Sequence, residues 1–398
     1  MKFQIRLRTE VESRFRWFGL FAFSVISTAI LVLPVTGAEQ KPMSIAAPAG
    51  DYSWPMFRSN LAHTASATLP KPYLPVGQLR WSFPAEGGID SSPAIYKGVV
   101  FVGADDGYLY AVDERNGKML WRAKLGGQIK SSPLVDQGTI YVGCEDSNLY
   151  AIDSLSGKIK WNFPAGGRIT SSPITANGLI FAGGWDATVY AIDKNGTLKW
   201  KFSSPDPAGR ILSSPAFSNG VLYATSHDGF LYALDPDTGA LKWKYKTGNK
   251  IYSSPMVMNN TVYFGSWDHN FYAVDSTTGK TLWKYAGAEN FSISPAGANG
   301  KVFVGNDDLK MYCLDAATGK LFWKTPLSSP VPLLSSSPAV SGGMLFVGSA
   351  DGKVYALDTR NGAIKWRYGT NRPVISSPAV AATGVCVGSQ DGNLYFIN

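Results

Sequence analysis

Short runs in which apolar and polar residues alternate recur along most of the chain, and each run is bounded by Gly, Asn or Asp. The stretch from Ser91 to Trp121, SSPAIYKGVVFVGADDGYLYAVDERNGKMLW, is typical. Alternation with a period of two, in residues such as Val, Ile, Phe and Tyr, predicts β-strands. No helical period interrupts the runs, so the pattern predicts about four short strands and tight turns in each stretch of this length.

The same stretch recurs eight times, with the proline of Ser-Ser-Pro as its marker and a spacing of 40 to 43 residues. The marker residues are Pro93, Pro133, Pro173, Pro215, Pro255, Pro295, Pro338 and Pro378. Four strands in about 40 residues are the size of one propeller blade. The pattern therefore predicts an all-β protein, an eight-bladed β-propeller of four-stranded antiparallel blades.

The two ends of the chain are expected to complete one blade together. The last copy runs from Ser376 to Asn398 and holds three strands without a tryptophan, whereas a strand at about 78–83, containing Trp81, precedes every marker. Pairing this N-terminal strand into the last blade closes the ring and leaves no gap in it.

Identical residues in all copies have structural explanations. One tryptophan marks each of the eight outer strands, and we expect these side chains to dock neighbouring blades: Trp81, Trp121, Trp161, Trp200, Trp243, Trp283, Trp323 and Trp366. The aspartates that recur after the second and the third strand suit hairpin turns. Lysines recur near the tryptophans, where they solvate the outer strands and protect an exposed sheet edge.

The segment from Ala111 to Trp121, read as Ala-x-Asp-x-x-x-Gly-x-x-x-Trp, resembles the tryptophan-docking motif of the PQQ-like repeat family. Further copies lie at 151–161, 233–243, 273–283 and 356–366, with variants at Cys313 and at 193–200. The resemblance covers roughly residues 78–398. Families with these repeats include quinoprotein alcohol dehydrogenases and BamB-type outer-membrane assembly factors, both eight-bladed, so the resemblance implies the fold strongly and the function weakly.

The N-terminus predicts export. Arginines precede an apolar run at 17–33, and the small residues Thr36-Gly37-Ala38 follow, which together indicate a secretory signal peptide cleaved after Ala38. The alternative is an uncleaved membrane anchor, for which a run of this length is short. No cysteine follows the run, so the lipid-attachment site of the BamB-type family is missing here. We predict a signal peptide at 1–38, a Pro/Ala-rich segment at 39–77, the propeller at 78–398, and a periplasmic or secreted location.

Charge and cysteine content exclude some classes of function. The net charge of +8 becomes smaller without the leader, and no basic stripe with interleaved aromatic residues predicts nucleic-acid binding. The three cysteines lie in separate copies and show no metal-ligand spacing, so we expect neither a disulfide nor a metal site from them. The segment from Trp54 to Thr64 is similar to one that precedes the first blade in PQQ-like repeat proteins. It could plug the channel or cover a blade, and His63 alone does not indicate catalysis.

A site that acts once per molecule must use positions at which the copies differ. Two rows of this kind stand just before the hairpin aspartate and five residues before the marker proline. In three consecutive copies they hold Trp185, His227 and Trp267 together with Arg168, Arg210 and Lys250. We predict that these six residues share the channel mouth, where they could bind an anionic or planar ligand or act as a hot spot for a protein partner. The alternative is a set of unrelated surface residues.

Catalysis is not indicated. A quinoprotein dehydrogenase needs PQQ, Ca²⁺ held by oxygen ligands and a carboxylate base, but the loops are short and the candidate carboxylates Asp90, Asp105, Glu145 and Asp307 are scattered over three copies. The histidines His63, His227 and His269 form no recognisable constellation. We therefore predict a non-catalytic, BamB-like scaffold in the cell envelope that binds a protein partner or a small ligand. A PQQ-dependent dehydrogenase is the alternative.

Overall fold

The structure is a computed structural model that describes residues 53–67, 74–327 and 336–398. The predicted signal peptide, its cleavage after Ala38 and the first part of the Pro/Ala-rich segment lie outside the described residues. Within the described ranges, no helix has the length and the apolar content that crossing a bilayer requires.

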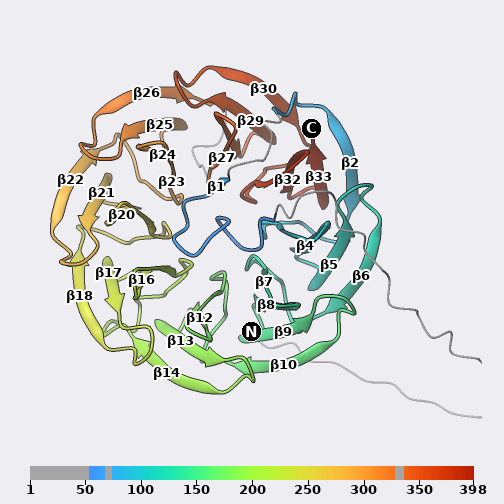
Figure 1. The fold of residues 1–398 in the computed structure, drawn as a ribbon, viewed down its shortest axis with the longest axis horizontal. Helices are drawn as coiled ribbons and strands as arrows, with labels where there is room; N and C mark the ends of the chain where they lie inside the picture. Colours follow the sequence, from blue (N-terminus) through green and yellow to red (C-terminus); the bar gives the residue numbers. More distant parts are fainter. Residues whose placement is uncertain (1–52, 68–73, 328–335) are drawn as a thin grey trace, which may run out of the picture. The chain divides into compact units, whose positions relative to one another are not determined.

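The described residues form 33 strands in eight sheets that surround a central axis (Figure 1). Blade 1 consists of β3 (Ala94–Tyr96), β4 (Val99–Gly103), β5 (Tyr108–Asp113) and β6 (Met119–Lys124). Blade 2 consists of β7 (Leu134–Asp136), β8 (Thr139–Gly143), β9 (Asn148–Asp153) and β10 (Ile159–Pro164). Blade 3 consists of β11 (Ile174–Ala176), β12 (Leu179–Gly183), β13 (Thr188–Asp193) and β14 (Leu198–Ser203). Blade 4 consists of β15 (Ala216–Ser218), β16 (Val221–Thr225), β17 (Phe230–Leu234) and β18 (Leu241–Lys246). Blade 5 consists of β19 (Met256–Met258), β20 (Thr261–Gly265), β21 (Asn270–Asp275) and β22 (Thr281–Ala286). Blade 6 consists of β23 (Ala296–Ala298), β24 (Lys301–Asn306), β25 (Lys310–Asp315) and β26 (Leu321–Pro326). Blade 7 consists of β27 (Ala339–Ser341), β28 (Met344–Gly348), β29 (Lys353–Asp358) and β30 (Ile364–Gly369), with β1 (Ser66–Ala67) added in parallel to β27.

Blade 8 combines both ends of the propeller, as predicted. It contains β31 (Ala379–Ala381), β32 (Gly384–Gly388) and β33 (Asn393–Ile397), and its outer strand is β2 (Leu79–Pro84). Trp81 lies opposite Phe396 in this antiparallel pair. The eight-bladed, all-β fold and its closure by the N-terminal strand are therefore confirmed, with the strand one residue further along the chain than 78–83.

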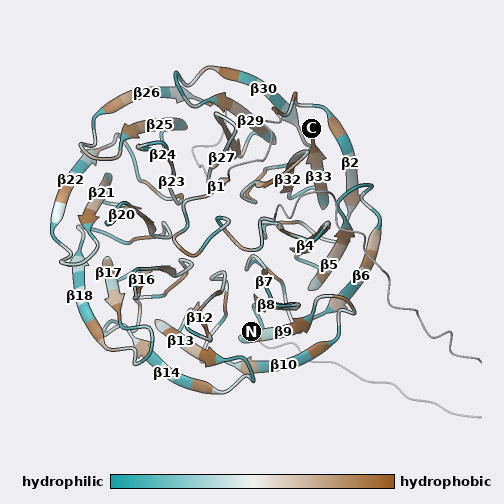
Figure 2. Ribbon diagram, viewed as in Figure 1, coloured by the Kyte–Doolittle hydropathy of each residue, from teal (hydrophilic) through white to brown (hydrophobic). Residues whose placement is uncertain are grey.

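The core lies between the blades. The second strand of each blade is almost entirely buried, as in β4 and β20, whereas outer strands such as β18 expose every second residue. Figure 2 shows this as alternating hydrophobic and hydrophilic segments along the outer strands. Cys144, Cys313 and Cys386 are free and buried, and they pack as small core residues.

The Ser-Ser-Pro repeat forms a closed ring of hydrogen bonds at the innermost strands. The backbone N–H of the second serine of each blade donates to the Oγ of the equivalent serine in the next blade. The ring closes where the Ser377 N–H donates to Ser92 Oγ at 2.9 Å. The acceptors in order are Ser132, Ser172, Ser214, Ser254, Ser294, Ser337, Ser377 and Ser92.

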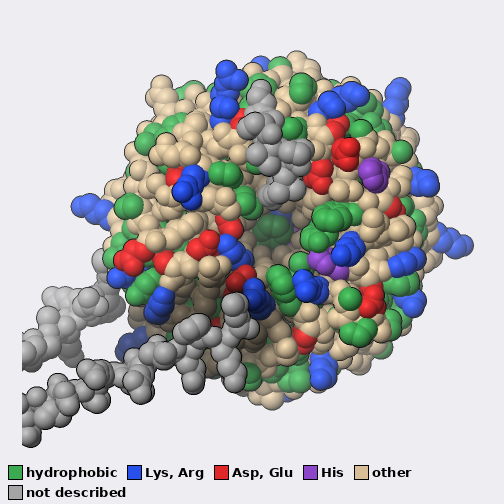
Figure 3. All heavy atoms as spheres, turned by 180° about the vertical axis from the view of Figure 1, so that it is seen from behind, with side chains coloured by type: hydrophobic (Ala, Val, Ile, Leu, Met, Phe, Trp, Pro, Cys, Tyr) green, Lys and Arg blue, Asp and Glu red, His purple; other side chains and the backbone are tan. Residues whose placement is uncertain are grey.

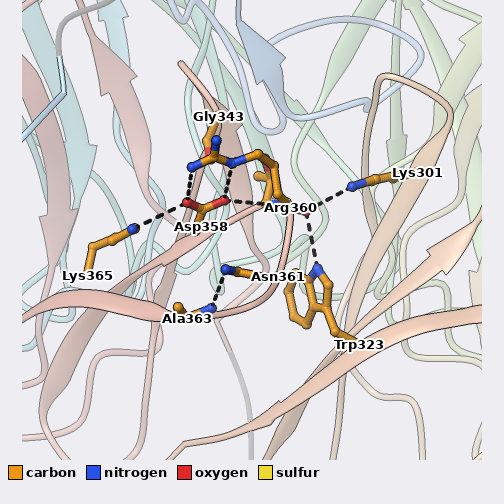
Figure 4. A network of polar contacts seen from close by, with 9 residues as sticks. Lys301, Trp323, Gly343, Asp358, Arg360, Asn361, Ala363 and Lys365 are labelled. Atoms are coloured by element: carbon orange, nitrogen blue, oxygen red, sulfur yellow. Dashed lines mark hydrogen bonds and ion pairs between the residues drawn. The ribbon is translucent and has the colours of Figure 1, made fainter.

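The recurring tryptophans join neighbouring blades at the periphery. Each indole Nε1 donates to a backbone carbonyl in the following blade or, for Trp366, to the Pro75 carbonyl ahead of β2. Figure 4 shows the junction of blades 6 and 7, where Trp323 Nε1 and Lys301 Nζ both donate to the Thr359 carbonyl at 3.2 Å. In the adjoining turn, hydrogen bonds from the Arg360 guanidinium and backbone N–H hold the pKa of Asp358 far below its usual range.

Residues 54–67, which we call the plug, cross the centre of the ring (Figure 1). Their backbone hydrogen-bonds to the inner strands of six blades, through the pairs Trp54–Ile95, Pro55–Val135, Leu61–Phe217, Ala62–Val257, Thr64–Gly297 and Ala65–Val340. Arg58 donates to the Pro338 carbonyl at 2.7 Å and to the Pro295 carbonyl, while His63 Nδ1 lies 3.2 Å from the Pro255 carbonyl. Of the two roles that the sequence allowed for this segment, the structure shows the one in the channel.

Candidate functional site at the channel mouth

The plug and the predicted site lie at opposite ends of the inner strands. The plug bonds to residues two positions after the marker prolines, whereas the predicted rows come five residues before the markers or belong to the hairpin beside that loop. The end away from the plug is therefore the open mouth of the channel. Figure 3 shows this face, with a hollow at its centre and both basic and acidic side chains around it.

Backbone hydrogen bonds bring the two predicted rows together within each blade. The Trp185 N–H donates to the Arg168 carbonyl at 2.9 Å, His227 to Arg210 at 3.0 Å, and Trp267 to Lys250 at 2.9 Å. The loop that enters the inner strand thus runs beside the hairpin that carries the aspartate. The six predicted residues consequently lie on blades 3, 4 and 5 around one sector of the mouth.

Trp185 contacts two guanidinium groups. The Arg210 Cζ is 4.6 Å and the Arg168 Cζ 5.3 Å from its ring centroid, within the range of cation–π attraction. The indole Nε1 donates to Thr170 Oγ1 at 2.9 Å, which fixes the ring orientation. Arg168 also pairs with Glu145, with Nη1 3.5 Å from Oε2. The charge of Arg168 is therefore compensated locally, in contrast to that of Arg210.

In the neighbouring sector three rings pack in a row, and two of them are stacked. Tyr252 lies 4.0 Å from His227 and 4.4 Å from Trp267 between ring centroids, and its plane is inclined by only 21° to the indole. Trp267 Nε1 donates to Ser292 Oγ at 3.0 Å. Together with the six predicted residues, Tyr252 forms a continuous surface that we call the mouth arc (Arg168, Trp185, Arg210, His227, Lys250, Tyr252 and Trp267).

His227 is the buried member of the mouth arc, with 9% of its surface exposed. Burial, and then the charges of Lys250 and Arg210, lower its pKa to about 4, while Asp228 acts in the opposite direction. The imidazole is therefore neutral at pH 7. Its Nε2 is buried without a hydrogen-bond partner among the described residues.

The carboxylates at the mouth bind side chains of the protein. Lys130 Nζ lies 2.7 Å from Asp90 Oδ2 and 2.5 Å from Asp105 Oδ1, and burial raises the pKa of Asp105. Asp307 accepts a hydrogen bond from Ser292 at 2.8 Å. Because a side-chain ammonium occupies the space between Asp90 and Asp105, this donor set does not fit Ca²⁺, which takes six to eight oxygen ligands.

More generally, no group of three or more His, Cys, Asp or Glu residues that could hold a metal ion occurs in the part of the chain that the structure describes. A separate cavity of 430 Å³ lies on the same face between blades 8 and 1, where Gly88, Arg372 and Gln390 contribute to its lining.

Sequence reasoning missed the residues that support the predicted ones. Lys130, Thr170, Tyr252 and Ser292 all stand three positions before a marker proline, and each contacts one of the mouth residues. This position also differs between the copies: Asp90, Lys130, Thr170, Leu212, Tyr252, Ser292 and Ile375 occupy it in the described residues. The variation between copies was therefore a signal for this third row as well.

These features define the class of the protein as an eight-bladed β-propeller with a plugged channel and an aromatic, cationic mouth. The family model described as "Outer membrane protein assembly factor BamB" matches residues 74–184, 106–216, 185–295 and 268–398. The chain therefore belongs to this family of PQQ-like repeat propellers. No curated protein matches its sequence.

Solved structures share the fold at low sequence identity. BamB from Moraxella catarrhalis is 20% identical with a TM-score of 0.72, over 81% of this chain and 100% of that one. The quinohemoprotein alcohol dehydrogenase from Comamonas testosteroni is 17% identical with a TM-score of 0.76, over 87% and 80%. The computationally designed Ika8 protein is 17% identical with a TM-score of 0.71, over 81% and 100%. Likeness at this level shows the fold alone and does not separate a scaffold from a dehydrogenase.

Proposed function

We propose that the protein is an exported, non-catalytic scaffold of the cell envelope that presents its mouth face to a protein partner. Membership in the BamB family supports this proposal, since the family description names an outer-membrane assembly factor. The leader sequence, with its expected cleavage after Ala38, supports an envelope location.

The observation that carries the proposal is the rigidity of the mouth arc. Trp185 and Trp267 are each fixed by a hydrogen bond from the indole Nε1, and Tyr252 packs against both His227 and Trp267. Tryptophan, tyrosine and arginine are the residues that most often dominate binding energy at protein interfaces. Side chains that are already ordered lose little conformational entropy on binding, so a preformed arc favours association.

A capture experiment with envelope extract tests the proposal. The wild-type protein is expected to retain a partner that mass spectrometry identifies, and the triple variant Trp185→Ala, Arg210→Ala, Trp267→Ala is expected to lose it. A matched control replaces Leu241, Lys242 and Lys244, exposed on the outer strand β18, with alanine and should capture normally. Thermal melting shows whether each variant is folded. Unchanged capture by a folded triple variant would place the binding surface elsewhere.

The alternative function, a PQQ-dependent dehydrogenase, draws on the shared fold with the quinohemoprotein alcohol dehydrogenase. The carboxylates at the mouth argue against it, because Lys130 binds two of them and Ser292 a third. Adding PQQ and Ca²⁺ to the purified protein tests this alternative. A quinone absorbance together with dye reduction in the presence of alcohols would overturn the scaffold proposal.

A further inference from the structure

Two cations of the mouth arc lack an acidic partner. Arg210 and Lys250 are exposed on adjacent blades, and neither forms an ion pair among the residues that the structure describes. Arg168, the third cation of the mouth arc, pairs with Glu145, and the nearby Lys130 pairs with two aspartates. Within the mouth arc, the uncompensated positive charge is therefore concentrated on Arg210 and Lys250.

His227 lies next to both of these cations. Its backbone N–H donates to the Arg210 carbonyl, and the charges of Lys250 and Arg210 both act on its imidazole. The carboxylate of Asp228 also faces this region, but it accepts hydrogen bonds from Tyr232 and Ser204 at 2.5 Å. His227 is neutral and adds no charge, so it leaves the two cations unneutralised beside a buried, polar ring.

We propose that Arg210 and Lys250 form a subsite for one carboxylate or phosphate group, positioned over His227. A guanidinium binds such groups through two parallel hydrogen bonds, and an ammonium adds a second point of charge. The contact with Trp185 holds the guanidinium of Arg210 in place before a ligand arrives. The anionic group comes either from a free small anion or from an acidic side chain of the partner; only the second source rests on the proposed function.

Titration of the purified full chain with two probes tests the subsite. The probes are inorganic phosphate and a hexaglutamate peptide, compared at equal ionic strength with chloride and a hexaglutamine peptide. NMR of the His227 imidazole gives its pKa, and calorimetry gives the dissociation constant. An anion held by Arg210 and Lys250 neutralises their charge, so we expect the pKa of His227 to rise by about one unit.

The variants Arg210→Gln and Lys250→Gln should each weaken binding of the effective probe by about tenfold, because each removes a charge-assisted hydrogen bond. Lys242→Gln is the matched control, since it removes one positive charge from the rim of blade 4, where Lys242 already pairs with Asp235 at 3.0 Å. This control should bind either probe as the wild type does.

Each outcome has one meaning. A shift with phosphate alone identifies a free anion as the ligand, and a shift with the glutamate peptide, alone or as well, identifies an acidic side chain. If calorimetry at pH 7 detects no binding of either probe beyond the chloride and glutamine controls, the subsite does not exist. If the wild-type protein binds the anion but captures no partner from envelope extract, the proposed function is wrong and the subsite is still supported.

Discussion

The smallest unit that holds the ring together is one tryptophan packed on one glycine. Gly279 in blade 5 has a φ of +69°, and a Cβ at this position would lie 2.6 Å from Cε3 of Trp243, which belongs to blade 4. Two features of this position require glycine. The left-handed turn disfavours a side chain, and the indole leaves no room for one. Gly300 has nearly the same φ, +71°, but has open space around its Cβ position.

The two glycines make a matched test of this packing. Gly279→Ala and Gly300→Ala carry a similar cost for the left-handed backbone, and only the first also displaces an indole. We expect Gly279→Ala to lower the free energy of unfolding by about 1–3 kcal/mol more than Gly300→Ala, the usual cost of overpacking. Urea denaturation measures both. Equal losses would mean that the indole does not rest on the glycine.

His63, in the plug, makes the stability of the protein depend on pH. Burial and the charge of Arg58 lower its pKa to about 3, against an ordinary value of 6.5. The unfolded chain binds this proton more readily, so the free energy of unfolding decreases as the pH falls below 6.5 and continues to decrease down to about 3. At pH 5 we expect a loss of about 2 kcal/mol relative to pH 7 from this residue. The variant His63→Gln should show a smaller change in melting temperature between pH 7 and pH 5. A slope identical to that of the wild type would contradict this role.

At the same scale, the mouth shows which residue positions a single sequence can bring together and which contacts it cannot predict. Trp185, His227 and Trp267 were found because they differ from their counterparts in other copies, and the structure places them beside Arg168, Arg210 and Lys250. Which of these cations is compensated could not be predicted. The pairing of Arg168 with Glu145 joins adjacent blades, and it depends on the rotation between them, which a repeat pattern does not contain.

At the scale of elements, the inner strands are joined by side chain to backbone contacts as well as by packing. The second serine of Ser-Ser-Pro offers its Oγ to the N–H of the preceding blade, which would otherwise be a buried donor without a partner. The sequence showed that this serine recurs but not why. Its partner is a backbone group in another copy, about 40 residues away.

The variant Ser254→Ala tests this contact. It removes the acceptor for the Ser214 N–H, a bond of 2.9 Å between two residues that are both 5% exposed. A buried donor without a partner costs about 1–3 kcal/mol, so we expect a loss of stability of this size in urea denaturation. Ser82→Ala, at an exposed position on the outer strand β2, should unfold like the wild type. Equal stability of the two variants would show that the ring of serines contributes nothing.

The plug is an element that its own residues disfavour locally. Arg58, Ser59, His63 and Ala65 all adopt a positive φ although none is glycine. Arg58 is also buried, and burial lowers its pKa to about 9. These costs are offset by backbone bonds to six blades, so the conformation of the plug is imposed by the channel and not by its sequence. For this reason the sequence predicted that the segment packs on the propeller but left open where.

At the scale of the whole molecule, the blade number and the closure of the ring followed from counting strands and tryptophans. The count worked because each blade is a local unit with its own turns, and because the last copy lacks one strand that the N-terminus supplies. The first and last strands of the propeller meet where the backbone N–H of Gln78, just before β2, donates to the carbonyl of Asn398 at 3.0 Å. The ring of eight blades is therefore closed by contacts between residues that are far apart in sequence, in the β2–β33 pair and in the bond from Ser377 to Ser92.

An engineered disulfide measures how much this closure contributes. Leu79 and Ile397 are opposite each other in β2 and β33, and Leu234 and Leu241 occupy the equivalent positions in β17 and β18 of blade 4. The members of the two pairs are equally exposed, 44% for Leu79 and Leu241 and 0% for Ile397 and Leu234, so the cysteine replacements cost similar packing. The first disulfide, however, closes a loop of nearly the whole propeller and the second a short hairpin.

Constraining the unfolded chain stabilises more when the loop is longer, and the chain-entropy relation gives a difference of about 3 kcal/mol in favour of the closing disulfide. We expect Leu79→Cys/Ile397→Cys to raise the melting temperature clearly above its reduced form, and Leu234→Cys/Leu241→Cys to raise it much less. Melting of oxidised and reduced samples makes the comparison. Both disulfides could instead raise the melting temperature equally. The ends of the propeller would then be joined already in the unfolded chain or separated in the native one, and closure of the ring would not contribute to stability.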